Sequence, residues 1–217
     1  MSDTLPAATI RTQVTVPLQL LDGYATTARV FSFNGLVDTG EHLALGLGDW
    51  VGALNRSTAG GSAPLVRLHS ECLTGDVFGS QRCDCGAQLR EAVERVTKAG
   101  GFLLYLRQEG RGIGLYTKLE AYELQDVGLD TYEANIALGH AEDERDYSSA
   151  AQMLGALGVD RVALLTNNTD KVEQLRRLGV TVTAQVPTSV HLSPTNAGYL
   201  AAKFNRSART LEFPVIN

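Results

Sequence analysis

Short apolar stretches separated by glycine and aspartate turns occupy the first fifty residues of the chain. Stretches 14–18, 28–33 and 42–47 have the length and apolar content of β-strands. We predict antiparallel strands joined by hairpins in this region. The segment NRSTAGGSAP that follows, residues 55–64, has the composition of a flexible loop.

From residue 64 onward, strand-like and helix-like patterns alternate. After residue 85, apolar residues recur at helical spacing, at Leu89, Ala92, Val93 and Val96. Gly100 and Gly101 then mark the end of this predicted helix. Strands are predicted at 64–69, 102–106, 162–165 and 180–186, and further helices at 113–127, from Asp146 to about 157, and at 170–178. This alternation favours helical crossovers. We therefore predict one α/β domain over residues 1–217, a mixed sheet with helical crossovers and N-terminal antiparallel strands.

The composition is that of an ordinary globular protein, with 44% hydrophobic and 20% charged residues. Its apolar runs are strand-sized, so no membrane span is predicted, and the N-terminus lacks the pattern of a secretory signal. We therefore expect a cytoplasmic protein with reduced thiols. The net charge of −5 argues against a nucleic-acid binder, although local charge can still attract a small polyanion.

All three cysteines of the chain, Cys72, Cys83 and Cys85, lie within one short stretch. Clustered cysteines in a reducing compartment indicate metal ligands, and three thiolates leave a tetrahedral Zn²⁺ one ligand short. In a closed structural site His69 would supply the fourth ligand, whereas an open catalytic site leaves that position to water. Buried cysteines without a metal are a third alternative. Spacing alone leaves all three open.

Two strand-to-helix turns contain residues suited to phosphate. The first, RQEGRGIG at 107–114, is rich in glycine and arginine, so backbone N–H and guanidinium groups can approach an anion. The second, LLTNNTDK at 164–171, places Thr166 and Lys171 at a helix start, where Asn168 or Thr169 could serve simply as a cap. Tight packing also explains a glycine-rich turn, and the sequence contains no Walker A motif.

Basic residues gather in or beside these motifs although the chain is acidic. They are Arg67, Arg82, Arg107, Arg111, Lys118, Arg145 and Lys171. The charge run AEDERDY at 141–147 is typical of a solvated loop, and spacing gives Asp143 and Arg145 no catalytic role. A metal site next to cationic glycine turns suits a polyphosphate ligand. These features predict a nucleotide-transforming hydrolase.

Seven motifs between about residues 66 and 171 resemble the GTP cyclohydrolase II family of riboflavin biosynthesis. In chain order they are HSECLTGD (69–76), RCDCG (82–86), RQEGRGIGL (107–115), AYELQD (121–126), EAN (133–135), DERDY (143–147) and LLTNN (164–168). The resemblance implies hydrolysis of GTP with release of formate from C8 and of pyrophosphate, giving 2,5-diamino-6-ribosylamino-4(3H)-pyrimidinone 5′-phosphate. The alternatives are a related ring-opening enzyme that retains the formyl group, or a non-catalytic module that binds zinc and GTP.

The resemblance also assigns roles to matching residues. The three cysteines would hold one Zn²⁺, with water completing the tetrahedron, and Tyr122 would assist ring opening. Asp143 would accept a proton. Arg145 would either attack the α-phosphate or clamp phosphate charge, and the clamp is the physical default because a guanidinium stays protonated.

The resemblance further implies a GTP-binding set, in which Glu71 or Gln88 suits the donors of the guanine edge. Mg²⁺ would bridge the triphosphate, and the protein would be a homodimer. A chain of this length leaves no room for the dihydroxybutanone phosphate synthase domain that is often fused to this family. The expected GTP-binding residues are Arg67, Leu68, His69, Ser70, Glu71, Gln88, Glu109, Gly110, Arg111, Thr131, Thr166 and Lys171.

Overall fold

The computed structural model describes residues 5–193, 195, 196 and 200, and the seven strands in this part of the chain form one mixed sheet. The strands are β1 (Thr9–Gln19), β2 (Ala25–Asn34), β3 (Leu43–Leu47), β4 (Leu65–Ser70), β5 (Gly101–Leu106), β6 (Arg161–Leu165) and β7 (Thr181–Val186). Their order is β1-β2-β3-β5-β4-β6-β7. The first four in this order pair antiparallel, and β5, β4, β6 and β7 run parallel. The predicted mixed sheet with N-terminal antiparallel strands is confirmed.

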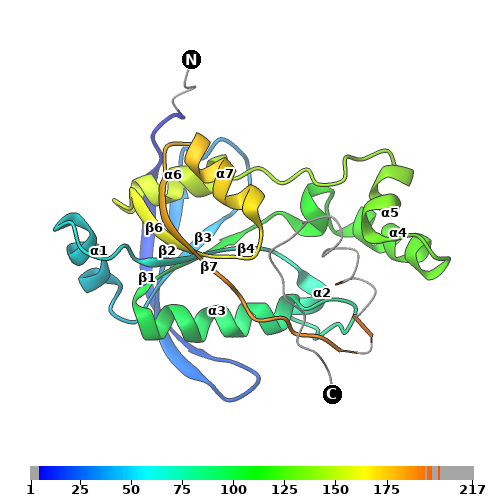
Figure 1. Cartoon of the computed structure of the whole chain (residues 1–217), viewed down its shortest axis with the longest axis horizontal. Helices are drawn as coiled ribbons and strands as arrows, with labels where there is room; N and C mark the ends of the chain where they lie inside the picture. Colours follow the sequence, from blue (N-terminus) through cyan, green and yellow to red (C-terminus); the bar gives the residue numbers. More distant parts are fainter. Residues whose placement is uncertain (1–4, 194, 197–199, 201–217) are drawn as a thin grey trace.

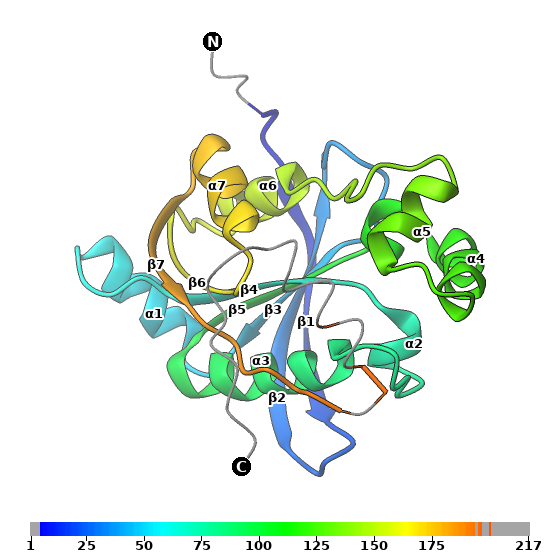
Figure 2. The same ribbon diagram turned by 45° about the vertical axis from the view of Figure 1, so that its right-hand side comes forward.

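Helices cover both faces of the sheet (Figures 1 and 2). Helix α3 (Cys85–Ala99) lies on one face, where its apolar side packs with Leu103 of β5. Helices α6 (Ser148–Ala156) and α7 (Thr169–Arg177) lie on the other face, in a larger core that contains Phe102 and Leu104. Successive residues of β5 thus point to opposite faces. Because both faces are buried, this strand is apolar throughout.

The remaining helices are α1 (Trp50–Thr58), α2 (Leu73–Asp76), α4 (Leu115–Asp126), α5 (Thr131–Ala137) and the 3₁₀ helix η1 (Glu109–Gly112). Helices α4 and α5 stand together at one side of the sheet (Figure 1). In the part of the chain that the structure describes, no helix combines the length and apolarity needed to cross a bilayer.

Four of these helices, α1, α2, α5 and η1, were not predicted from the sequence. The flexible loop predicted at 55–64 was wrong for residues 55–58, which complete α1, because Trp50 packs edge-on against Phe31 with ring centroids 5.6 Å apart and anchors that helix. Helix α5 was not predicted. Its N-terminus carries a capping box between Asp130 and Glu133, and this D-x-x-E spacing is a signal that could have revealed it.

The chain connections create a crevice beyond the carboxyl end of β4. From β4 the chain passes through α3 to β5 on one side, and from β5 it passes through α6 to β6 on the other side of β4. These two crossovers lie on opposite faces of the sheet (Figure 2). Ligands of open α/β sheets bind at such a switch point. Ser70, Leu106 and Leu165 end the three strands there.

Candidate active site

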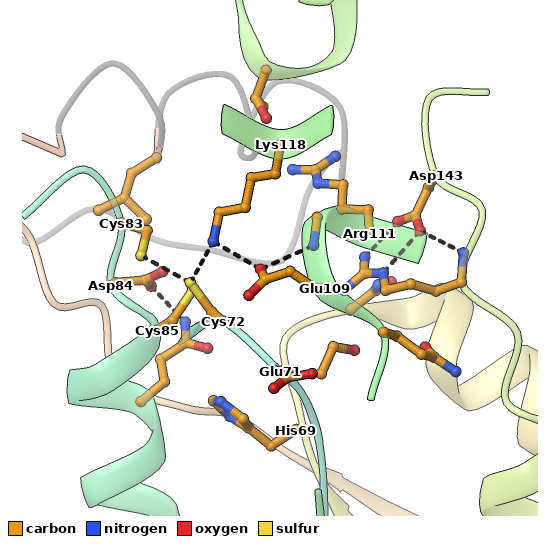
Figure 3. Close-up of a pocket in the computed structure, with 18 of the residues that line it drawn as sticks. His69, Glu71, Cys72, Cys83, Asp84, Cys85, Glu109, Arg111, Lys118 and Asp143 are labelled. Atoms are coloured by element: carbon orange, nitrogen blue, oxygen red, sulfur yellow. Dashed lines mark hydrogen bonds and ion pairs between the residues drawn. The ribbon is translucent and has the colours of Figure 1, made fainter. Parts of the chain in front are cut away.

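A pocket of about 530 Å³ lies at this edge of the sheet (Figure 3). The volume is within the range of small-molecule sites. All predicted site residues line the pocket except Leu68. The side chain of Leu68 is 1% exposed and belongs to the core, while its backbone carbonyl accepts a hydrogen bond from Lys171 Nζ at 2.8 Å. The side chain of Leu68 therefore cannot contact GTP in this pocket.

The three cysteine thiols converge on one another within the pocket (Figure 3). Cys72 precedes α2, and Cys85 opens α3 two residues after Cys83. The three Sγ atoms lie within 4.8 Å of one another, and Cys72 Sγ is 3.7 Å from Cys83 Sγ. Thiolates bound to a tetrahedral Zn²⁺ at about 2.3 Å would lie roughly 3.8 Å apart. The donor type and spacing therefore fit zinc.

His69 lies outside this group of thiols and is held by other partners. Its Nε2 is 3.1 Å from both carboxylate oxygens of the buried Asp76, and its ring stacks on Tyr105. Asp76 also accepts hydrogen bonds from the Tyr105 hydroxyl at 2.9 Å and from the Cys72 backbone N–H at 3.1 Å. Burial lowers the pKa of His69, so the ring is neutral. This geometry favours a pocket-wall role for His69 over the closed Cys₃His alternative.

Gly75 permits the close approach of the thiols. A Cβ at this position would lie 2.9 Å from Cys83 Sγ and 3.1 Å from Cys72 Sγ. We expect Gly75→Ala to weaken zinc binding at least about tenfold, because the ligands must move to admit the methyl group. Competition with a chromophoric chelator measures this affinity.

The matched control for this change is Gly155→Ala in α6, where no atom lies within 4 Å of an added Cβ. This variant should keep the parent's zinc affinity, because its added methyl group meets open space. Unchanged zinc binding by Gly75→Ala would contradict the crowding argument.

The turn after β5 adopts a left-handed conformation at the pocket wall. Arg111 has φ 65°, uncommon for a residue with a Cβ, and Gly110 and Gly112 beside it also have positive φ. The Arg111 guanidinium lies 3.9 Å from the centroid of the Tyr132 ring in α5. Its backbone carbonyl accepts the Glu144 N–H at 3.0 Å. The turn therefore joins α5 and the DERDY segment to the pocket.

Glu109, in the same turn, directs its carboxylate onto the protein itself (Figure 3). Its Oε1 accepts from Lys118 Nζ at 2.8 Å and from the Gly110 N–H at 3.0 Å. Its Oε2 accepts from the Leu73 N–H at 2.7 Å. Three of the acceptor sites of this carboxylate are therefore used within the protein.

The turn after β6 supplies another wall. Asn168 caps α7 by accepting the Asp170 N–H at 2.9 Å, as one of the two sequence readings expected. Thr166 Oγ1 accepts the Asn168 N–H at 3.0 Å. Thr166 and Lys171 both line the pocket, so capping and pocket formation coexist here. The preceding helix α6 begins at Ser148, close to its predicted start at Asp146, and Asp146 Oδ1 accepts the Ser148 N–H at 2.7 Å.

Asp143 and Arg145 form an ion pair at the pocket. Arg145 donates to Asp143 Oδ1 from Nε at 2.8 Å and from its backbone N–H at 3.1 Å. Burial acts to raise the pKa of Asp143, but the hydrogen bonds and charge of Arg145 outweigh it and the pKa is lowered. Asp143 is therefore an ionised carboxylate at neutral pH.

Tyr122 lies near the thiols. Its hydroxyl is 3.4 Å from Thr74 Oγ1, which in turn is 3.7 Å from Cys72 Sγ, and the Arg82 guanidinium lies 4.6 Å from the centroid of its ring. Burial raises the pKa of Tyr122. The phenol is therefore protonated at neutral pH and can donate a hydrogen bond.

A buried chain of polar side chains runs beside the thiols. Arg67 Nη2 donates to Gln88 Oε1 at 2.8 Å, and Gln88 Nε2 donates to Asp84. Asp84 is 4% exposed. The sequence predicted no role for Asp84 or Asp76, although both lie inside the RCDCG and HSECLTGD motifs. The neighbouring cysteines already explained these motifs as metal-ligand segments.

The pocket carries acidic side chains as well as the predicted group of cations. Among the residues that the structure describes, six cationic and six acidic ones line it. Arg107, which we expected beside the phosphates, does not line the pocket; its Nε donates to Glu71 Oε2 at 2.7 Å. Carboxylates pair with Arg82, Lys118 and Arg145, so the cations do not form a uniform positive surface.

The family model of GTP cyclohydrolase II matches residues 12–187. The chain belongs to the GTP cyclohydrolase II family. GTP cyclohydrolase-2 of Psychromonas ingrahamii is 49% identical over 187 residues, covering 86% of this chain and 90% of that protein. GTP cyclohydrolase-2 of Vibrio cholerae is 49% identical over 185 residues, covering 85% and 90%.

Membership of the GTP cyclohydrolase II family confirms the resemblance seen in the motifs. The protein is an enzyme of this family, whose activity is GTP hydrolysis in riboflavin biosynthesis. Among solved structures, a two-domain 3,4-dihydroxy-2-butanone 4-phosphate synthase from A. baumannii matches 85% of this chain and 41% of its own, with a TM-score of 0.39 and 16% identity. That similarity is too low to carry an argument.

Proposed function

We propose that this enzyme uses zinc to open the imidazole ring of GTP, releasing formate from C8 and pyrophosphate. The product would be 2,5-diamino-6-ribosylamino-4(3H)-pyrimidinone 5′-phosphate. The observation that carries the proposal is that three thiols, Tyr122 and the Asp143–Arg145 pair line one pocket. We further propose that residues 1–217 act as one domain, in the cytoplasm, where thiols such as these three unpaired cysteines stay reduced.

The thiol end of the pocket suits the ring-opening chemistry. Bound at the three cysteines, Zn²⁺ would supply a Lewis acid that makes water nucleophilic at neutral pH. The neutral phenol of Tyr122 donates a hydrogen bond to the substrate or to the reacting water. Glu71 and Gln88 offer acceptors to the N1–H and amino donors of guanine. These contacts would hold C8 toward the thiols.

The opposite walls suit the triphosphate. Arg111, Arg145 and Lys171 line the pocket as cations, and Thr166 offers a hydroxyl. Mg²⁺ would accompany the triphosphate and neutralise part of its charge, as in other reactions of nucleoside triphosphates. Arg145 clamps developing phosphate charge, because its guanidinium stays protonated beside the Asp143 carboxylate. Asp143, ionised at neutral pH, would accept the proton that water releases when it attacks the α-phosphate.

A product assay tests the proposal. The pure protein incubated with GTP, Zn²⁺ and Mg²⁺ should yield formate, pyrophosphate and the pyrimidinone, identified by mass spectrometry. A product that still carries the formyl carbon would support the related ring-opening reaction instead. GTP binding without either release would support the non-catalytic module, and both of these results would overturn the proposed function.

We also propose that the enzyme is a homodimer. Large apolar side chains are exposed on and beside α4, including Tyr116 at 81% and Val127 at 77%, and a second subunit could cover them. Size-exclusion chromatography with light scattering should give twice the mass of one chain, and a single-chain mass at micromolar concentration would contradict a stable dimer.

A further inference from the structure

Lys118 is a buried cation for which the proposed reaction names no role. It lies in the first turn of α4 and is 8% exposed, although lysine side chains are almost never fully buried unless they are paired. Its position in the pocket wall places it next to the thiols (Figure 3). A charge held in this position calls for a specific explanation.

The ammonium group of Lys118 donates to three partners from two different segments. Nζ lies 3.1 Å from Cys72 Sγ, 3.0 Å from Thr74 Oγ1 and 2.8 Å from Glu109 Oε1. These three contacts match the three protons of an ammonium group, which has no others to give.

Glu109 extends the arrangement back to the cysteine segment. Its second carboxylate oxygen accepts the Leu73 N–H at 2.7 Å. The segment 72–74 is therefore attached to α4 and to the turn after β5 by a closed ring of hydrogen bonds that passes through Lys118. Loss of the lysine would leave the buried Glu109 carboxylate without its cation.

We propose that Lys118 is a positioning residue of the metal site, which holds the Cys72 thiolate by an N–H···S hydrogen bond and offsets the negative charge of the three thiolates. The inference rests on the zinc site of the proposed function. Three thiolates around Zn²⁺ have a net charge of about −1, and a fixed ammonium group 3.1 Å from one sulfur compensates it. Partners of this kind hold metal ligands in place and tune the metal.

Lys118→Met tests the inference, because methionine fills a similar volume without donating a hydrogen bond or carrying charge. We expect zinc affinity to fall about 10–100-fold, measured by chelator competition in the full chain. With Co²⁺ in place of zinc, the thiolate-to-metal charge-transfer band should move to longer wavelength, because a thiolate that loses its hydrogen bond donates electrons more easily. Lys98→Met removes an exposed lysine of α3 and should change neither readout.

A folded Lys118→Met protein with the parent's zinc affinity and an unshifted cobalt band would overturn the inference, since a lysine that only pairs with Glu109 predicts that result. Should this variant not fold, Lys118→Gln keeps one uncharged donor and should show a smaller loss of affinity and a smaller band shift. Unchanged values in that variant would overturn the inference equally. If the parent protein bound no zinc at all, the proposed metal site would fail, and this outcome is separate from equal binding by parent and variant.

Discussion

Cys83→Ser should abolish formate release from GTP while the protein remains folded. A serine hydroxyl is not deprotonated at neutral pH, so the metal loses one of its three ligands. Loss of the metal would remove several kcal/mol of transition-state stabilisation, which corresponds to a rate loss on the order of 10³ or more. Formate production and zinc content per chain measure the two effects together.

The fold should tolerate this substitution because Cys83 is half-buried and lies between α2 and α3, outside the sheet. Circular dichroism would verify that it does. Gln81→Ser, an exposed change in the same connection, is the matched control and should retain both zinc and activity. Formate release at the parent's rate by Cys83→Ser would contradict a catalytic metal at these thiols.

Arg145→Gln should slow pyrophosphate release about 10²- to 10³-fold, the effect of removing one donor from a site of developing charge. Glutamine keeps part of the side chain's length and hydrogen-bonding capacity but loses the positive charge and the fork of N–H groups. Pyrophosphate release at saturating GTP is the measurement. Arg56→Gln, on α1 away from the pocket, should behave like the parent protein.

The same variant carries a prediction for pH. Burial acts to raise the pKa of Asp143, whereas Arg145 lowers it and prevails in the parent protein. Without Arg145 the pKa of Asp143 rises, so the carboxylate needed as proton acceptor is lost at a higher pH. The acidic limb of the pH–rate profile should therefore move to higher pH in Arg145→Gln. A limb that stays in place would argue against Asp143 as the proton acceptor.

Local patterns were sufficient for much of the fold. The apolar run at residues 102–106 predicted a strand buried on both faces, and β5 is such a strand. Helix α3 and the strands from β4 to β7 also follow from their periods and their glycine stops. Helix α1 escaped prediction because its anchor, the contact between Trp50 and Phe31, joins two distant segments that no local window includes.

For the pocket, the amino-acid sequence was enough to identify the three cysteines as a group, because ligands close in the chain stay close in space. It could not choose between an open and a closed metal site. The position of His69 favours the open site, because the fold of the segment around α2 brings Asp76 to it as a partner. The orientation of Leu68 also depended on the tertiary structure. Side chains along β4 alternate between the two faces of the sheet, and that of Leu68 points into the core.

The partners of Lys118 could be recognised only from the three-dimensional structure. Its sequence position indicates a basic residue on a helix beside the phosphate-suited motifs, but it does not indicate its partners. Its three acceptors lie 9, 44 and 46 residues away in the chain, and they meet because parallel strands bring their carboxyl ends to one edge of the sheet. Residue type and local period decide which elements form. Which side chains become partners depends on packing between elements, and a buried charge is stable only where that packing supplies its acceptors.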